Sequence, residues 1–209
     1  MNRGRPRTFD TEQALDTALK LFWQHGYEGT SIALLADAIG VNPPSLYAAF
    51  GNKEELFVQT IERYVDLNGH IYRDSLQKET AQEVAQGILE GVVKLVTRPG
   101  SPNGCLMVQG ALATSPDSEK IRRMMVTLRG RAEGWLVDRF ERARQEGDLP
   151  PDADPHGLAC YLMTLNSGLA VQAKSGISQK QLLKVVAIAL ESWPRYQPEF
   201  PAKARLQTK

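Results

Sequence analysis

Polar side chains lie at two points where helices are expected to begin, and they could bind phosphate groups. Thr30 and Ser31 precede one apolar helical pattern, and Asn52 precedes a second pattern that opens with Lys53. The first turn of a helix leaves backbone N–H groups unpaired and carries the positive end of the helix dipole, so it attracts anions. Lys53 adds a full positive charge. The same residues suit a purely structural role as helix caps, and the residue types alone leave both roles open.

The N-terminus carries three arginines, Arg3, Arg5 and Arg7, before the first acidic residue. Gly4 and Pro6 separate them, which keeps this arm slim and extended. The arrangement resembles the core of the AT-hook, a motif that lies in the narrow minor groove of A·T-rich DNA, where the negative potential favours arginine. A solvated, disordered terminus is the alternative if no DNA-binding unit follows.

The residues after the arm predict three short helices with a sharp break before the third. Gly40 lies in that break, and Pro43 suits the first position of a helix. This pattern is typical of a helix-turn-helix, in which the start of the second helix of the pair meets base edges in the major groove. Pro43, Pro44 and Ser45 occupy that start. Tyr47 lies one turn further along, where its hydroxyl could reach a phosphate.

The rest of the chain predicts about six longer helices, because apolar residues recur at helical spacing and strand alternation is almost absent. The predicted spans are 53–77, 80–97, 105–114, 117–147, 155–174 and 178–193. We therefore expect an all-α protein of about nine helices. Its N-terminal three-helix bundle should form a DNA-binding domain over residues 1–52, followed by a second helical domain over 53–194. Residues 195–209, rich in proline and basic residues, are expected to form a disordered tail.

The composition narrows the class of protein. The 209 residues carry 25 Lys plus Arg against 24 Asp plus Glu, a net charge of +1, which excludes a uniformly basic surface but not a local basic patch. No apolar run approaches the ~20 residues that span a bilayer. Neither a metal-binding cysteine pair nor a catalytic motif is found. We expect a cytoplasmic protein that is not an enzyme, contacts no membrane and uses no metal or cofactor.

Residues 9–57 resemble the TetR/AcrR family of bacterial transcriptional regulators. The resemblance rests on Gly26-Tyr27, Thr30-Ser31, Ile32, Ile39-Gly40-Val41, Leu46-Tyr47, Phe50, Lys53-Glu54 and Leu56-Phe57. It implies a homodimer that binds a palindromic operator in double-stranded DNA, usually represses transcription and responds to a small-molecule effector. Carried over by position, Tyr47 and Lys53 would bind phosphates and Pro43–Ser45 would face bases. Ala48-Ala49 replaces larger residues of many relatives, so no contact from that position is carried over. Activation in place of repression stays open.

The last two predicted helices are expected to form the dimer interface. They carry apolar residues on more than one face, and such a helix needs a partner on each face. Gly168 lies within one of them, where it would allow a second helix to approach closely. A bundle of two helices from each subunit would use both features, although burial within one chain is the alternative. The predicted interface residues are Leu158, Leu162, Leu165, Gly168, Leu169, Val186, Leu190 and Trp193.

The effector site is expected among the central helices, which hold no dense charge cluster. This absence favours a small effector that is mostly apolar or weakly polar. The predicted site residues are Val93, Val96, Cys105, Met107, Met124, Leu128, Trp135, Tyr161 and Asn166. Each of them also suits the core. A DNA-binding architectural or regulatory protein without an effector is therefore the alternative.

Cys105 points to a second alternative. It follows Pro102-Asn103-Gly104 and opens a predicted helix, whose start would lower the pKa of a thiol. An accessible thiol of low pKa could sense oxidants or electrophiles. The opposing interpretation is a small residue buried under the loop.

Overall fold

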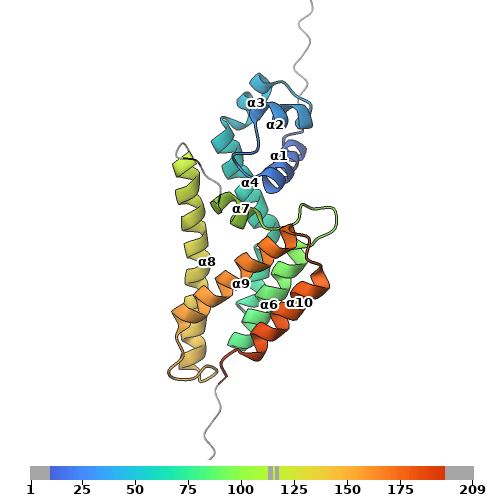
Figure 1. Ribbon diagram of the computed structural model, residues 1–209. Helices are drawn as coiled ribbons and strands as arrows, with labels where there is room; N and C mark the ends of the chain where they lie inside the picture. Colours follow the sequence, from blue (N-terminus) through green and yellow to red (C-terminus); the bar gives the residue numbers. More distant parts are fainter. Residues whose placement is uncertain (1–9, 113–114, 116–117, 196–209) are drawn as a thin grey trace, which may run out of the picture.

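The protein consists of helices and their connections over the residues that a computed structural model describes, which are 10–112, 115 and 118–195. Ten helices follow one another in these ranges (Figure 1). They are α1 Thr11–His25, α2 Ile32–Ile39, α3 Pro43–Phe50, α4 Lys53–Asn68, α5 His70–Ser75, α6 Ala81–Val96, α7 Leu106–Leu112, α8 Glu119–Gln145, α9 Pro155–Lys174 and α10 Gln179–Glu191. The predicted all-α fold is confirmed.

Helices α4 and α5 nearly form one helix. Gly69 joins them with φ −64° and ψ −17°, which are helical values, and its N–H donates to the carbonyl oxygen of Val65 at 2.6 Å. Counted together, α4 and α5 bring the described chain to nine helices, the number that the sequence predicts.

Helices α1–α4 enclose the first hydrophobic core. Its central side chains are fully or almost fully buried, and they include Phe22, Leu35, Leu46 and Phe57. The Phe57 ring meets Phe22 edge-on, with the ring centres 5.0 Å apart, and meets Tyr27 at 5.1 Å. Such aromatic pairs stabilise beyond the burial of their surface. This core fixes the three short helices against α4.

Helices α6, α8, α9 and α10 enclose the second core. Figure 1 shows α8 along one side of the molecule, with α9 crossing from it toward α6 and α10. Phe140 of α8 is fully buried, and its ring centre lies 5.5 Å from that of Trp193, which follows α10. The long α8 is therefore held to the end of α10 as well as to α9.

The two cores meet where α7 and the start of α8 reach the first core. Leu106, Ile121 and Met125 belong to α7 and α8, yet they pack with the first core. Trp23 also donates a buried hydrogen bond from Nε1 to the carbonyl oxygen of Gly104 at 3.0 Å. The two predicted domains thus share an extended contact, and the boundary between residues 52 and 53 remains a prediction.

Candidate nucleic-acid interface

The turn between α2 and α3 sets the direction of α3. Gly40 ends α2 in the left-handed region, with φ 79° and ψ 32°, where a larger residue would be strained. Asn42 then caps α3, because its Oδ1 accepts a hydrogen bond from the N–H of Ser45 at 2.9 Å. Pro43 takes the first helical position, where its missing N–H loses no bond. Together these residues build the predicted helix-turn-helix.

One face of α3 is open to solvent. Pro43–Pro44 and Tyr47 are exposed, with 47% of the Tyr47 surface accessible. Leu46 and Phe50 are buried on the opposite face. Ser45 is half-buried, and its backbone N–H is already bonded to Asn42. The open face can approach a groove while the buried face locks the helix in place.

Ser31 and Thr30 differ in their position at the start of α2. Ser31 is exposed and caps the helix, because its Oγ accepts from the N–H of Leu34 at 3.1 Å. Thr30 is fully buried, and its hydroxyl donates to the carbonyl oxygen of Gly26 at 2.7 Å. The Thr30 side chain was expected to bind a phosphate. This expectation is corrected, because its hydroxyl is buried and already bonded within the chain.

Lys53 lies at the start of α4, beside the loop between α1 and α2. Its Nζ lies 4.3 Å from the centre of the Tyr27 ring, a cation–π arrangement. Burial lowers the pKa of Lys53, and the Glu28 carboxylate opposes that shift. Next to it, Asn52 and Glu55 form a reciprocal capping box. The Lys53 ammonium group is thus held beside the start of α4, and the two together could bind an anion such as a phosphate.

Two acidic residues of α1 are paired by a base from α4. Arg63 lies 3.0 Å from Asp16 through Nε and 3.1 Å from Glu12 through Nη1. This pairing offsets the negative charge of α1. Arg63 and Asp16 are 47 residues apart in the sequence, so no local pattern predicts their contact. The predicted basic arm lies outside the described residues, and it comprises Arg3, Arg5 and Arg7.

The predicted effector residues are not gathered in one place. Two are fully buried in the second core and three are half-buried against the first: Val93 and Val96, then Met107, Met124 and Leu128. Trp135 and Tyr161 lie at the surface, 54% and 39% exposed. Both were predicted to line the effector site or the core, and their exposure within this chain is a correction to the core assignment. On α8 it is the neighbouring Leu136 that is fully buried.

Cys105 and Asn166 belong to a set of polar side chains that includes two tyrosines. Cys105 is half-buried against both cores, and its Sγ lies 3.3 Å from the hydroxyl of Tyr64. Asn166 is buried and donates from Nδ2 to the hydroxyl of Tyr72 at 2.7 Å, while its Oδ1 has no partner in the described chain. Burial, and after it the nearby Cys105, raises the pKa of both tyrosines. Neither tyrosine, Tyr64 of α4 or Tyr72 of α5, was predicted to belong to the effector site.

Four predicted dimer residues are buried inside their own chain, which corrects their assignment to an interface: Leu162, Leu169, Val186 and Trp193. Three more are half-buried against the same core, namely Leu158, Leu165 and Leu190. Gly168 is open, since a Cβ added there would have nothing within 4 Å. Other apolar residues of α9 and α10 are exposed, and they are Tyr161, Val171, Leu183, Val185 and Ile188.

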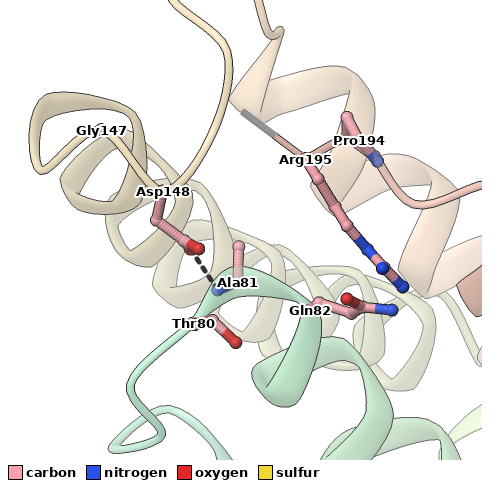
Figure 2. Close-up of a pocket in the computed structure, with 7 residues that line it drawn as sticks. All are labelled: Thr80, Ala81, Gln82, Gly147, Asp148, Pro194 and Arg195. Carbon is pink, nitrogen blue, oxygen red and sulfur yellow. Dashed lines mark hydrogen bonds between the residues drawn. The ribbon is translucent and has the colours of Figure 1, made fainter. Parts of the chain in front are cut away.

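Two hollows lie elsewhere on the molecule. One of about 260 Å³ is lined by Thr80, Ala81, Gln82, Gly147, Asp148, Pro194 and Arg195 (Figure 2). In it, Asp148 accepts a hydrogen bond from the N–H of Ala81 at 2.6 Å, so a carboxylate of the chain already occupies the start of α6. The other, of about 530 Å³, is lined by Lys20, Gln24, residues 100–103 and Lys174. Neither lining includes a predicted effector residue.

Membrane and metal contacts were both predicted to be absent. Within the described ranges, no helix has the length and apolar character that crossing a membrane requires. The same ranges hold no group of three or more His, Cys, Asp or Glu side chains placed to share a metal ion.

Family models match both parts of the chain. Residues 14–60 match the model of bacterial regulatory proteins of the tetR family. Residues 78–188 match the model of the tetracyclin repressor-like C-terminal domain. The first match covers the helix-turn-helix described above, and the second covers α6–α9 and most of α10.

Full-length relatives and solved structures agree with these matches. The chain is 34% identical over 195 residues to the HTH-type transcriptional repressor ComR of Escherichia coli (strain K12), covering 92% of this chain and 93% of the relative. It is 32% identical over 191 residues to the repressor BdcR of the same organism, covering 90% and 91%. It is similar to a cysteine mutant of the TetR family transcriptional regulator CifR complexed with operator DNA, with 41% identity, a TM-score of 0.85 and coverage of 91% and 100%. The chain therefore belongs to the TetR family of bacterial regulatory proteins, and it is a DNA-binding transcriptional regulator, not an enzyme.

Proposed function

We propose that the protein is a homodimeric repressor that binds a palindromic operator and leaves it when a small-molecule effector binds. The open face of α3 carries the proposal, because exposed Tyr47 lies there beside Pro43–Pro44 and Lys53 lies at the next helix start. ComR and BdcR are named repressors, and the CifR mutant was solved with operator DNA, which supports both the sign and the target. We place the protein in the cytoplasm, where bacterial DNA lies.

In the proposed complex, each subunit inserts α3 into a major groove. Tyr47 and Lys53 bind phosphates, while Pro43–Ser45 face base edges. Ser31 adds a phosphate contact at the start of α2. The two α3 helices of a dimer should meet half-sites about 34 Å apart, one turn of DNA. The arm with its three arginines would follow the adjacent minor groove.

The dimer is proposed to form through the outward faces of α9 and α10. Val185 and Ile188 are exposed at helical spacing on α10, and Ile188 is 67% exposed. Tyr161 and Val171 are exposed on α9, and Gly168 between them leaves room for a close helix. Water contact with this much apolar surface is unfavourable, and a second copy would remove it.

Replacing Ile188 by Asp should weaken the dimer at least tenfold (order of magnitude), because a C2 interface would bury the new carboxylate twice without a partner. The fold of one subunit should be unaffected, since Ile188 is exposed within its own chain. Sedimentation velocity over a range of concentrations measures the change. Val126→Asp is the matched control, because Val126 is 48% exposed on α8. A dimer that tolerates Ile188→Asp, or one that only Val126→Asp dissociates, would contradict the proposed face.

The effector is proposed to be a small, weakly polar molecule that binds at Cys105, Asn166 and the two tyrosines. The buried Oδ1 of Asn166 lacks a partner in the described chain, and such an acceptor is costly to leave unpaired. A ligand with one hydrogen-bond donor would satisfy it, and the half-buried Sγ of Cys105 and its apolar neighbours would cover the rest. The effector lowers operator affinity only if it binds the free form more tightly than the DNA-bound form.

One experiment tests both parts of this function. Purified protein is incubated with fragments of its source genome, and the bound fragments are sequenced. A palindromic motif is the expected result, and diffuse, salt-sensitive binding would favour an architectural protein instead. The selected fragment is then challenged with a library of small compounds. Release by weakly polar compounds is expected, whereas release only by highly charged ones would contradict the proposed effector class.

A further inference from the structure

The start of α8 contacts the DNA-binding half of the chain through the carboxylate of Glu28. Glu28 lies in the loop between α1 and α2. Its Oε1 accepts hydrogen bonds from the backbone N–H and the hydroxyl of Ser115, both at 3.0 Å, and another from the hydroxyl of Ser118. Ser118 is the cap residue of α8, but its side chain makes no cap bond within α8. The carboxylate of Glu28 therefore lies near the positive end of the α8 dipole.

A second contact joins the same two parts. The Nζ of Lys120, in the first turn of α8, forms an ion pair with Glu54 in the first turn of α4. Lys120 is largely exposed, so this pair alone would contribute little. The position of this ion pair matters more than its strength. Glu54 directly follows Lys53 in the sequence, and Glu28 directly follows Tyr27, so both acids that contact the start of α8 adjoin the Tyr27–Lys53 pair.

The four residues Tyr27, Glu28, Lys53 and Glu54 form one electrostatic group. The Lys53 ammonium lies over the Tyr27 ring, and the charge of Glu28 favours the charged form of that lysine. Burial raises the pKa of Tyr27, and the carboxylates of Glu54 and Glu28 add to this effect. A shift at the start of α8 would therefore act on Lys53 through Glu28, and on the Tyr27 ring beneath Lys53 through both Glu28 and Glu54.

Helix α8 is suited to carry such a shift. It spans 27 residues along one side of the molecule (Figure 1). Its first turns pack with the first core through Ile121 and Met125, and its later part packs with α9 and the second core. Glu28 is exposed, so water competes for its carboxylate and the contact can open without unfolding either core. Opening a contact of this kind costs little, whereas breaking a buried pair is strongly destabilising.

We propose that the start of α8 holds Lys53 in its phosphate-binding position through Glu28 and Glu54, so that these two acids are positioning residues for operator binding. This inference rests on the proposed function. It also gives the effector domain a direct connection to the DNA contact. A displacement of α8 opens the Glu28 contact, lets the loop between α1 and α2 move, and withdraws the ammonium group from the phosphate.

The test compares Glu28→Gln with Asp37→Asn on the fragment that the unaltered protein selects. Both changes remove one negative charge from the DNA-binding half, and Asp37 is an exposed residue of α2 outside this contact. If charge alone mattered, both variants would bind DNA more tightly. The positioning role predicts that Glu28→Gln binds about fivefold more weakly while Asp37→Asn does not. The salt dependence of Glu28→Gln should also flatten, by about 0.9 in log–log slope for each phosphate that the protein no longer neutralises.

A mutant cycle separates positioning from general damage. Ser115→Ala with Ser118→Ala removes the hydroxyl donors from the α8 side without changing any charge. This pair should weaken binding as Glu28→Gln does, and combining all three changes should add little, because coupled residues are not additive. Thermal unfolding checks that each variant is folded. Additive effects would overturn the positioning role and leave the proposed function standing. A Glu28→Gln variant that binds DNA as Asp37→Asn does would have the same consequence. If the unaltered protein selects no palindrome, the proposed function fails first.

Discussion

Replacing Tyr47 by Ala should weaken binding to the selected operator about 100-fold. The hydroxyl of Tyr47 would otherwise bond a phosphate, and a hydrogen bond to a charged group contributes roughly 1.5 kcal/mol. A symmetric dimer loses two such bonds, or about 3 kcal/mol, which corresponds to about two orders of magnitude in affinity. Tyr47 is 47% exposed, so removing its ring should leave the core intact. The loss of affinity should therefore come from the lost DNA contact and not from a loss of folding. Fluorescence anisotropy with a labelled operator measures it.

Lys53→Gln is the matched comparison, because it removes a charged phosphate ligand where Tyr47→Ala removes a neutral one. Only charged ligands release counterions from DNA, so Lys53→Gln should flatten the salt dependence and Tyr47→Ala should leave the slope nearly unchanged. Tyr47→Phe identifies the hydroxyl as the source of the effect. An unaltered affinity in Tyr47→Ala would show that α3 does not dock as proposed. A changed slope in Tyr47→Ala would instead indicate that charged contacts elsewhere had moved with it.

The N-terminal elements could be predicted because their limits are set by local chemistry. Gly40 adopts a left-handed conformation that few other residues tolerate, and Asn42 caps the helix that follows it. Both effects act within four residues, so they can be read from the sequence. The outward direction of Tyr47 follows from the same limits, since Leu46 and Phe50 must face the core.

The faces of the C-terminal helices could not be predicted in the same way. Helix α10 carries apolar residues on more than one face, so its pattern does not say which of these faces meets the core. Val186 proves to be buried, while Ile188, two positions away, is exposed. On α8 the pattern likewise does not indicate which of two neighbours is buried: Trp135 is exposed and Leu136 is buried. These choices depend on the packing of α6, α9 and α10 together, which no single helix encodes.

Contacts between the two halves were beyond sequence reasoning for a different reason. Glu28 and Ser118 are 90 positions apart. Taken alone, Glu28 is an ordinary residue for a loop and Ser118 an ordinary residue for a helix cap. Their meeting depends on the direction in which α8 leaves the α7 connection. A carboxylate and a hydroxyl are too common on protein surfaces to signal a pairing over such a separation.

Replacing Phe57 by Ala should lower the free energy of unfolding by about 3–5 kcal/mol. The Phe57 side chain has no exposed surface, and its ring touches Phe22 of α1 and Tyr27 of the following loop. Its removal leaves a cavity where α1 meets α4, and it also takes away two aromatic contacts. A protein of this size should lose about 2–4 °C in Tm for each kcal/mol. The expected fall is therefore about 6–20 °C, measured by calorimetry at one fixed protein concentration.

Phe57→Leu and Leu67→Ala are the controls for this change. Phe57→Leu refills most of the cavity and should restore much of the stability, whereas Leu67→Ala lies on the same helix at a site that is 50% exposed and should change it by less than about 0.5 kcal/mol. Because Tyr27 also supports Lys53, Phe57→Ala should reduce operator affinity even at temperatures where it is folded. A variant with the stability of the unaltered protein would mean that α1 and α4 are held together without this ring. A destabilised variant with full operator affinity would separate the core from the phosphate contact, and would place the support of Lys53 on Glu28 and Glu54 alone.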